Sequence, residues 1–247
     1  MTSRPQATRV RAAVRRAKAG GERFLSGVLP GASGRRLQAQ AFADEWAAAN
    51  LDARQETGPL WVVLGDSASQ GIGATTRNSG YVGVVHELLR RRDAWRVINL
   101  SRVGAGVADV LARQLPELTA LTETEPAALV TCLIGAEDVV RRVPGLDLSM
   151  RQLIAALPPG SVVSTVPSPA AAALNGVIRE EAARHQMRMA DLRARRGEPS
   201  RSLVSLDDVA HGVWAAAVIT AIDGPPAQLA PPTDPNLPIV PIDPVGA

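Results

Sequence analysis

Residues 61–74, WVVLGDSASQGIGA, constrain the fold of this chain more than any other stretch. A run of four apolar residues, 61–64, ends in Gly-Asp-Ser, and a small, glycine-rich segment follows. This order predicts a buried strand, a sharp turn and the start of a helix. Open α/β sheets bind their ligands at the carboxyl ends of the strands, which is where Ser67 is expected to lie. Ser67 is therefore the candidate nucleophile.

Three alternatives compete for the same stretch. The GIG sequence is similar to the turn of short-chain dehydrogenases, but five residues separate Gly65 from Gly71. That family's Tyr-x-x-x-Lys pair cannot be built either, because Lys18 is the only lysine. A phosphate-binding P-loop needs a lysine after its glycine loop and is excluded for the same reason. An ordinary strand-to-helix turn with an incidental serine remains open from this segment alone.

The rest of the chain alternates strands with helices. Its 247 residues, 46% of them hydrophobic, suffice for one α/β domain with a sizeable core. Strands are predicted at 61–64, 95–100, 128–134 and 161–166, with a fifth built from pieces near 187–192 and 202–206. Helices are predicted at 37–50, 81–92, 107–118, from after 169 to about 185, and at 212–222. This alternation predicts right-handed crossovers and a parallel sheet. The single cysteine, Cys132, lies in an apolar run and is expected to be buried and structural.

Charge divides the chain into three parts. Residues 1–36 hold nine basic residues against Glu22 alone, a formal charge of +8, which leaves −5 for the remainder of the net +3. We interpret 1–36 as a basic arm, 37–222 as the folded domain and 223–247 as a proline-rich tail without regular structure. The acidic body argues against nucleic-acid binding by the domain.

The basic arm does not resemble a secretory signal, because arginines are scattered through it and its apolar piece FLSGVL is too short. No run of about 18 apolar residues is present to span a membrane. We therefore expect a cytoplasmic protein. A solvated flexible leader is the favoured interpretation of the arm, and weak contact with an anionic membrane is the alternative. The sequence does not indicate an oligomeric state.

A second chemical motif comes just before the closing helix, at DDVAH (207–211). Asp208 stands three residues ahead of His211 on an expected turn. A carboxylate so placed can accept the imidazole Nδ1–H and leave Nε2 facing outward as a base. Asp-x-x-His alone is a weak signal. Combined with Ser67 at the same edge of one sheet, it suggests a Ser-His-Asp triad.

The chain resembles the SGNH (GDSL-type) serine hydrolases over about residues 60–222. Four blocks carry the resemblance: GDSASQGIGA, NLSRVGAG, IGAED and DDVAH. The resemblance implies a flavodoxin-like three-layer sandwich with about five parallel strands, and no metal or organic cofactor. It assigns Ser67 as nucleophile and Asp208 with His211 as the acid–base pair. The oxyanion hole would use the N–H groups of Ser67 and Gly104 and a third-block side chain.

Two departures from the family pattern affect the expected chemistry. The third block should read Gly-x-Asn-Asp, but Glu137 stands where the asparagine amide would donate. Removing one oxyanion-hole donor costs about 10²- to 10³-fold in rate, and an ionised carboxylate donates nothing. Glu137 could instead turn toward Arg141 or Arg142 one turn later, or act as a donor if a dry pocket kept it protonated. The second departure is that His211 runs straight into GVWAAA where the family has proline.

The expected function is hydrolysis of a carboxylic ester or thioester of a small molecule through an acyl-Ser67 intermediate. The alternative is a weakened or inactive protein of the same fold that binds a ligand or a protein partner. The acyl length and the alcohol group cannot be read from the sequence.

Overall fold

The computed structural model describes residues 32–193 and 206–228. Most of the expected arm, the expected tail beyond residue 228, and the 202–205 part of the expected fifth strand lie outside these residues. Five strands form the sheet: β1 (Leu60–Gly65), β2 (Arg96–Asn99), β3 (Leu129–Leu133), β4 (Val162–Ser164) and β5 (Arg188–Ala190). Their order is β2-β1-β3-β4-β5, and every neighbouring pair is parallel. The predicted parallel sheet is confirmed.

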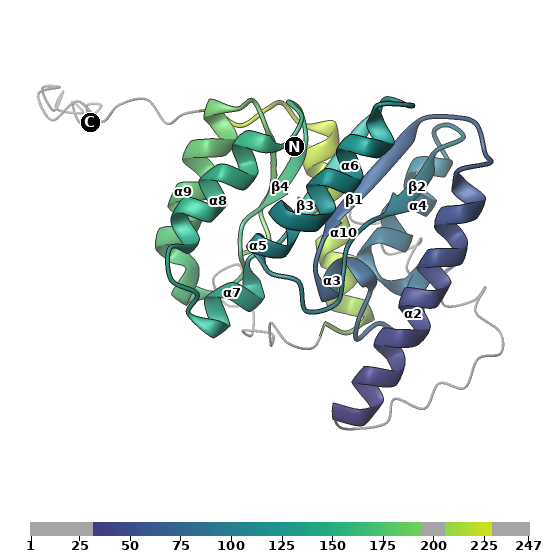
Figure 1. Ribbon diagram of the computed structural model, residues 1–247, viewed down its shortest axis with the longest axis horizontal. Helices are drawn as coiled ribbons and strands as arrows, with labels where there is room; N and C mark the ends of the chain where they lie inside the picture. The colour runs from purple at the N-terminus through teal and green to yellow at the C-terminus, as the bar shows by residue number, and fades with distance from the viewer. Residues whose placement is uncertain (1–31, 194–205, 229–247) are drawn as a thin grey trace, which may run out of the picture.

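Helices and helical turns connect the strands (Figure 1). They are α2 (Ala32–Ala53), α3 (Ser67–Gln70), η1 (Arg77–Ser79), α4 (Tyr81–Arg90), α5 (Val107–Asp109), η2 (Val110–Gln114), α6 (Leu115–Thr122), α7 (Ala136–Arg141), α8 (Leu146–Ala156), η3 (Pro169–Ala171), α9 (Ala172–Arg184) and α10 (Asp208–Asp223). The first described helix begins at Ala32, before the expected domain start at 37. The sequence did not lead us to expect α8, which lies between β3 and β4 in the chain. No helix in the described ranges combines the length and apolar character needed to cross a bilayer.

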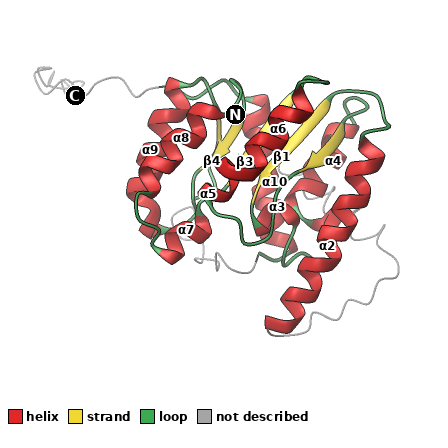
Figure 2. Cartoon of the chain, in the orientation of Figure 1, coloured by secondary structure: helices red, strands yellow, loops and turns green. Residues whose placement is uncertain are grey.

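The sheet is the middle layer of a three-layer α/β sandwich (Figure 2). Successive residues of β1 alternate between the two faces, as strand geometry requires. Leu60, Val62 and Leu64 pack in one core cluster with residues of α6, α8 and α9. Trp61 and Val63 pack in the other with residues of α4 and α10. All six residues of β1 are buried, which explains its continuous apolar sequence.

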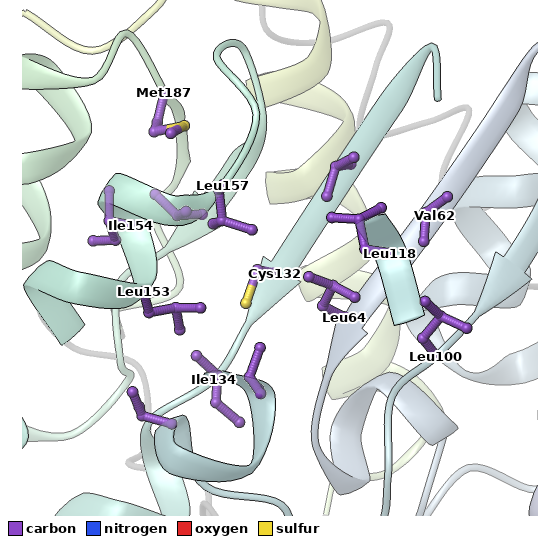
Figure 3. Close-up of a cluster of buried hydrophobic side chains, with 14 of the residues drawn as sticks. Val62, Leu64, Leu100, Leu118, Cys132, Ile134, Leu153, Ile154, Leu157 and Met187 are labelled. Atoms are coloured by element: carbon purple, nitrogen blue, oxygen red, sulfur yellow. The ribbon is translucent and has the colours of Figure 1, made fainter. Parts of the chain in front are cut away.

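The first core is drawn in Figure 3, where Cys132 of β3 lies among aliphatic side chains from neighbouring strands and helices. Its side chain is buried, as predicted. Burial raises the pKa of the thiol far above its ordinary range. Cys132 is therefore a packing residue and not a reactive thiol.

Helix α2 lies along the edge strand β2. It contributes Ala53 to one core and Trp46 to the other. Asn50 pairs twice with the backbone of Asn99, accepting its N–H at 2.8 Å and donating to its C=O at 2.9 Å. This covers polar groups of a strand that would otherwise be an open edge.

Candidate active site

Ser67 is the first residue of α3 and is separated from the carboxyl end of β1 by Asp66 alone. Asp66 caps this short helix, its Oδ1 accepting the N–H of Ala68 at 2.9 Å. Gly65 turns the chain with φ +145°, and an added Cβ would lie 2.5 Å from the carbonyl oxygen of Leu133. Only glycine fits this turn, because both the backbone conformation and the space exclude a side chain. The Gly-Asp-Ser sequence thus specifies the turn that presents Ser67.

A buried glutamine fixes the same turn from the opposite side. Gln114 accepts the N–H of Gly65 at 2.8 Å and donates to its C=O at 2.9 Å. It belongs to η2, a π-helical turn, and is fully buried. π-Helical turns occur often at functional sites. No sequence pattern predicted these two hydrogen bonds, because a glutamine in an amphipathic helix is usually a surface residue.

The Ser67 hydroxyl contacts the second block directly. Its Oγ accepts the N–H of Gly104 at 3.0 Å. Gly104 has φ +75°, in the left-handed region that favours glycine, and that conformation orients its N–H. The structure therefore brings together two of the residues expected to form the oxyanion hole.

Glu137 follows β3 in the first turn of α7. Its carboxylate pairs with Arg141, one turn later, at 3.0 Å. This is one of the arrangements that the sequence left open. The side chain of Glu137 pairs with Arg141 and carries no amide, so it does not supply the amide donor that the resemblance implies at this position.

The neighbouring Asp138 joins the second and third blocks. Its carboxylate accepts the N–H of Val107 at 3.1 Å. A Cβ on Gly106 would lie 2.5 Å from Asp138 Oδ1, so Gly106 and Asp138 approach each other closely. The GAGV and GAED segments are therefore packed against each other.

Asp66 is the most perturbed carboxyl near the nucleophile. Burial raises its pKa to about 7; the N–H of Ala68 acts in the opposite direction, and the charges of Glu137 and Asp138 add to the rise. The charge beside Ser67 consequently changes near neutral pH.

His211 lies in the first turn of α10 and is completely buried. Its Nδ1 accepts the N–H of Tyr81 at 3.2 Å, and its Nε2 lies 3.2 Å from the carbonyl oxygen of Ile72. Because Nδ1 accepts a hydrogen bond, the neutral ring carries its proton on Nε2 and donates it to Ile72. Burial lowers the pKa of His211, against the opposing effects of Ile72 and of the charges of Asp208 and Asp207.

The carboxylate of Asp208 is held by Thr75. Its Oδ1 accepts the Thr75 N–H at 2.7 Å and its Oδ2 accepts the Thr75 hydroxyl at 2.9 Å. Asp207 caps α10 by accepting the N–H of Ala210 at 2.8 Å. Thr75 was not predicted to take part in the site.

These contacts correct the expected geometry of the acid–base pair. Asp208 and His211 lie inside the closing helix, which begins four residues before the expected 212, and not on a preceding turn. His211 Nδ1 is an acceptor from Tyr81 and not a donor to Asp208, and Nε2 faces Ile72. Among the described residues, no hydrogen bond joins Ser67 to His211. The helix starts at the Asp207 cap, so His211 lies on α10, and its buried imidazole is hydrogen-bonded to Tyr81 and Ile72.

Residues 71–76, which we call the post-nucleophile loop, contact both Asp208 and His211. Gln38 of α2 accepts the N–H of Gly73 at 3.0 Å and donates to the C=O of Ala74 at 2.8 Å. The same loop supplies the carbonyl for His211 and both donors for Asp208. It therefore links the first described helix, the nucleophile segment and the last helix.

Known proteins with similar structures share this arrangement of elements. LAE5, an alpha/beta hydrolase enzyme from the metagenome of Lake Arreo, is 21% identical, with a TM-score of 0.54 over 68% of this chain and 96% of that chain. A variant of Axe2, an acetyl xylan esterase from Geobacillus stearothermophilus, is 18% identical, with a TM-score of 0.54 over 71% and 98%. The esterase EstA from Pseudoalteromonas sp. is 17% identical, with a TM-score of 0.51 over 67% and 97%. These likenesses establish the fold.

No curated protein sequence gives a significant match. The sequence model of the GDSL-like Lipase/Acylhydrolase family matches residues 63–211, more than half of the chain. The match runs from β1 to His211 and includes Ser67, Gly104, Glu137 and Asp208. By this match the chain belongs to the GDSL-like lipase/acylhydrolase family.

Proposed function

We propose that this protein is a serine hydrolase that cleaves a carboxylic ester or thioester through an acyl intermediate on Ser67. The observation that carries the proposal is the 3.0 Å contact between Ser67 Oγ and the Gly104 N–H. A nucleophile and an oxyanion donor must both lie near the same reacting carbonyl. Their contact at the carboxyl end of β1 provides such a point.

In the proposed reaction, Ser67 Oγ attacks the carbonyl carbon and passes its proton to His211 Nε2. The N–H groups of Ser67 and Gly104 stabilise the oxyanion of the tetrahedral intermediate. Collapse expels the alcohol or thiol, which takes the proton from His211 and leaves the acyl group on Ser67. Water then repeats the sequence on the acyl-enzyme and releases the carboxylic acid.

This role requires His211 to change its tautomer. A base at Nε2 has its proton on Nδ1, whereas in the structure Nδ1 accepts from Tyr81. The ring must therefore leave the Ile72 carbonyl and turn Nδ1–H toward an acceptor, for which we propose Asp208. The charge of Asp208 already acts to raise the pKa of His211, which favours the imidazolium that forms during the reaction.

A second candidate function is ligand binding without turnover. Two observations favour it: both nitrogens of His211 face backbone groups, and the Glu137 carboxylate is paired with Arg141. A protein that kept this arrangement when a ligand bound would hold an ester near Ser67 without activating the hydroxyl.

A fluorophosphonate probe separates the two candidates, because it reacts with an activated serine without needing the natural substrate. We expect stoichiometric labelling that Ser67→Ala abolishes and that Ser168→Ala, at a serine following β4, leaves intact. Hydrolysis of p-nitrophenyl esters should likewise be lost in Ser67→Ala and kept in Ser168→Ala. A folded protein that stays unlabelled would reject the hydrolase, and hydrolysis that survives Ser67→Ala would remove Ser67 from the mechanism.

A further inference from the structure

The helical segment between β2 and β3 carries one polar side chain into an apolar core. Its three parts, α5, η2 and α6, follow one another without a break from residue 107 to residue 122. The buried residues of this segment are Val107, Val110, Gln114, Leu118 and Leu121. The four apolar ones belong to the first core cluster, where Leu118 packs beside Val62 and Leu64 of β1 (Figure 3). Gln114, with an exposed fraction of 0%, places its amide on the same inward face.

The Gln114 amide takes the place of a neighbouring strand beside Gly65. The pairing of β1 with β2 ends at Val63 and Asn99, whereas the pairing of β1 with β3 continues to Gly65. Beyond the end of β2, Gln114 supplies both partners: its Oε1 accepts the Gly65 N–H at 2.8 Å and its Nε2 donates to the Gly65 C=O at 2.9 Å. Buried peptide groups without partners are unfavourable, so the amide replaces the main chain of an absent strand residue.

The π-helical turn places Gln114 at this point. In η2 the N–H of Leu115 donates to the C=O of Val110, five residues earlier, and not to the residue four earlier. Pro116, which has no N–H to donate, follows directly in the first turn of α6. A π turn holds one residue more than an α-helical turn, which changes the residue that faces inward at its end. Here that residue is Gln114.

The Gly65 carbonyl oxygen also binds the loop that carries the oxyanion donor. It accepts a second hydrogen bond, from the Arg102 N–H at 3.2 Å. Arg102 precedes Gly104 by two residues, just as Gly65 precedes Ser67. The two short segments meet again where the Gly104 N–H donates to Ser67 Oγ at 3.0 Å. The position of the Gly65 carbonyl therefore helps to set the separation of the nucleophile and the oxyanion donor.

We propose that Gln114 is a positioning residue of the candidate site: by holding both peptide groups of Gly65, its amide fixes the distance between Ser67 Oγ and the Gly104 N–H. Its effect on hydrolysis rests on the proposed function, whereas its effect on the two loops does not. An amide suits this place because it offers a donor and an acceptor without a charge. A displacement of about 1 Å at a reacting group can cost about 10²-fold in rate, which gives a completely buried side chain a large influence on the reaction.

Gln114→Met tests the proposal, because methionine has a similar length but forms neither hydrogen bond. We expect the rate at which a fluorophosphonate labels Ser67 to fall about 10- to 100-fold. Leu118→Ala is the matched control, since it removes buried atoms from the same face of the helix but no hydrogen bond to Gly65. Labelling of the folded control should stay close to that of the unmodified protein. Equal losses in the two variants would show that Gln114 acts only as part of the core and would overturn the proposal.

Gln114→Glu adds a readout that packing alone would not give. A protonated carboxyl group has the donor and the acceptor of the amide, whereas an ionised one has no donor for the Gly65 C=O. Burial raises the pKa of a carboxyl group, so labelling relative to the unmodified protein should be nearly complete at about pH 5–6 and should fall at least about tenfold by pH 9. In Gln114→Met the ratio should stay constant, because Asp66 and the other native groups titrate in both proteins. A ratio for Gln114→Glu that does not change with pH would contradict the role of the amide donor.

Amide hydrogen exchange separates failure of this proposal from failure of the hydrolase function. In Gln114→Met we expect faster exchange at Gly65, which has lost its acceptor, and at Arg102, whose N–H binds a carbonyl that is no longer held. If Gln114→Met does not fold, Gln114→Glu compared at low and high pH provides the same measurement. Faster exchange together with an unmodified protein that is never labelled would reject only the hydrolase. Unchanged exchange at Arg102 would overturn the positioning role, whatever the labelling.

Discussion

His211 caps helix α4 through Tyr81, its Nδ1 accepting the first N–H of that helix at 3.2 Å. The N-terminal N–H groups of a helix have no partner within it, so the imidazole satisfies one of them. The ring also stacks on Tyr81, with centroids 6.5 Å apart. A residue with a proposed catalytic role is thus also a structural connection between α10, α4 and the post-nucleophile loop.

We expect His211→Ala to lower the free energy of unfolding by about 2–4 kcal/mol, because it leaves a cavity and removes the partners of a buried N–H at Tyr81 and a partly buried carbonyl at Ile72. Urea unfolding measures the change. His185→Ala is the matched control: that ring is partly exposed and pairs with Glu181, so the loss should stay below about 1 kcal/mol. Equal losses in the two variants would show that the contacts of His211 with Tyr81 and Ile72 contribute little.

The pKa of Asp66 makes stability depend on pH. Because burial raises this pKa from 3.8 to about 7, the folded protein keeps a proton that the unfolded chain has released between these values. The stabilisation is complete below pH 3.8 and is lost as the pH rises through about 7, with a limit of roughly 4 kcal/mol. His211 acts in the opposite direction, since its lowered pKa costs stability as the pH falls below about 6.5.

Asp66→Asn isolates the contribution of the Asp66 pKa to stability, because the amide oxygen can still accept the N–H of Ala68. We expect the free energy of unfolding of this variant, relative to that of the unmodified protein, to rise by on the order of 1–4 kcal/mol from about pH 5 to pH 8. Denaturant unfolding at the two pH values measures the gain. Asp93→Asn is the control, since Asp93 is exposed and also accepts a following N–H, at Ala94. A gain that is the same at both pH values would contradict a raised pKa.

Glu137→Asn tests whether the carboxylate blocks the oxyanion hole. Since Glu137 is held by Arg141, we expect kcat for p-nitrophenyl acetate to change by less than about threefold, well short of the effect of an oxyanion donor. The variant should also lower the pKa of Asp66, because the charge of Glu137 contributes to its rise. A tenfold increase in kcat would instead show that a neutral amide at this position donates to the transition state.

Gly73→Ala should damage the post-nucleophile loop. Gly73 has φ +92°, and an added Cβ would lie 2.2 Å from the carbonyl oxygen of Leu206. We expect a loss of more than about 2 kcal/mol, since backbone strain and a clash with main-chain atoms add. Gly145→Ala is the control: its φ is +67°, but nothing lies within 4 Å of the added carbon, so only strain of about 1–2 kcal/mol is expected. Equal losses would indicate that the loop moves away from Leu206 without cost.

The strands could be predicted because burial on both faces produces continuous apolar runs in the sequence, as in Leu60–Gly65. The fifth strand was harder, because only Arg188–Ala190 pairs and two of these three residues are half-buried. The roles of Ser67 and Gly104 could be predicted because glycine-rich turns are recognisable from a few consecutive residues. Thr75, Gln38 and Gln114 could not, because their partners lie 35 to 133 residues away in the chain and no local pattern encodes such contacts.

The orientation of His211 could not be predicted from the sequence for a related reason. Asp-x-x-His fixes the spacing of two side chains but not where the helix begins. The N-terminal cap at Asp207 sets that start, and the direction of the ring follows its contacts with Tyr81 and Ile72.

Residues from both ends of the described chain form hydrogen bonds with the post-nucleophile loop. Gln38 lies 35 residues before Gly73, whereas Asp208 and His211 lie 133 and 139 residues after Thr75 and Ile72. A chain growing on the ribosome therefore exposes Ser67 long before the groups that hold its surroundings have been made. The contacts of Thr75 and Ile72 with α10 can consequently form only after α10 has emerged, and a nascent chain halted before that point would lack them.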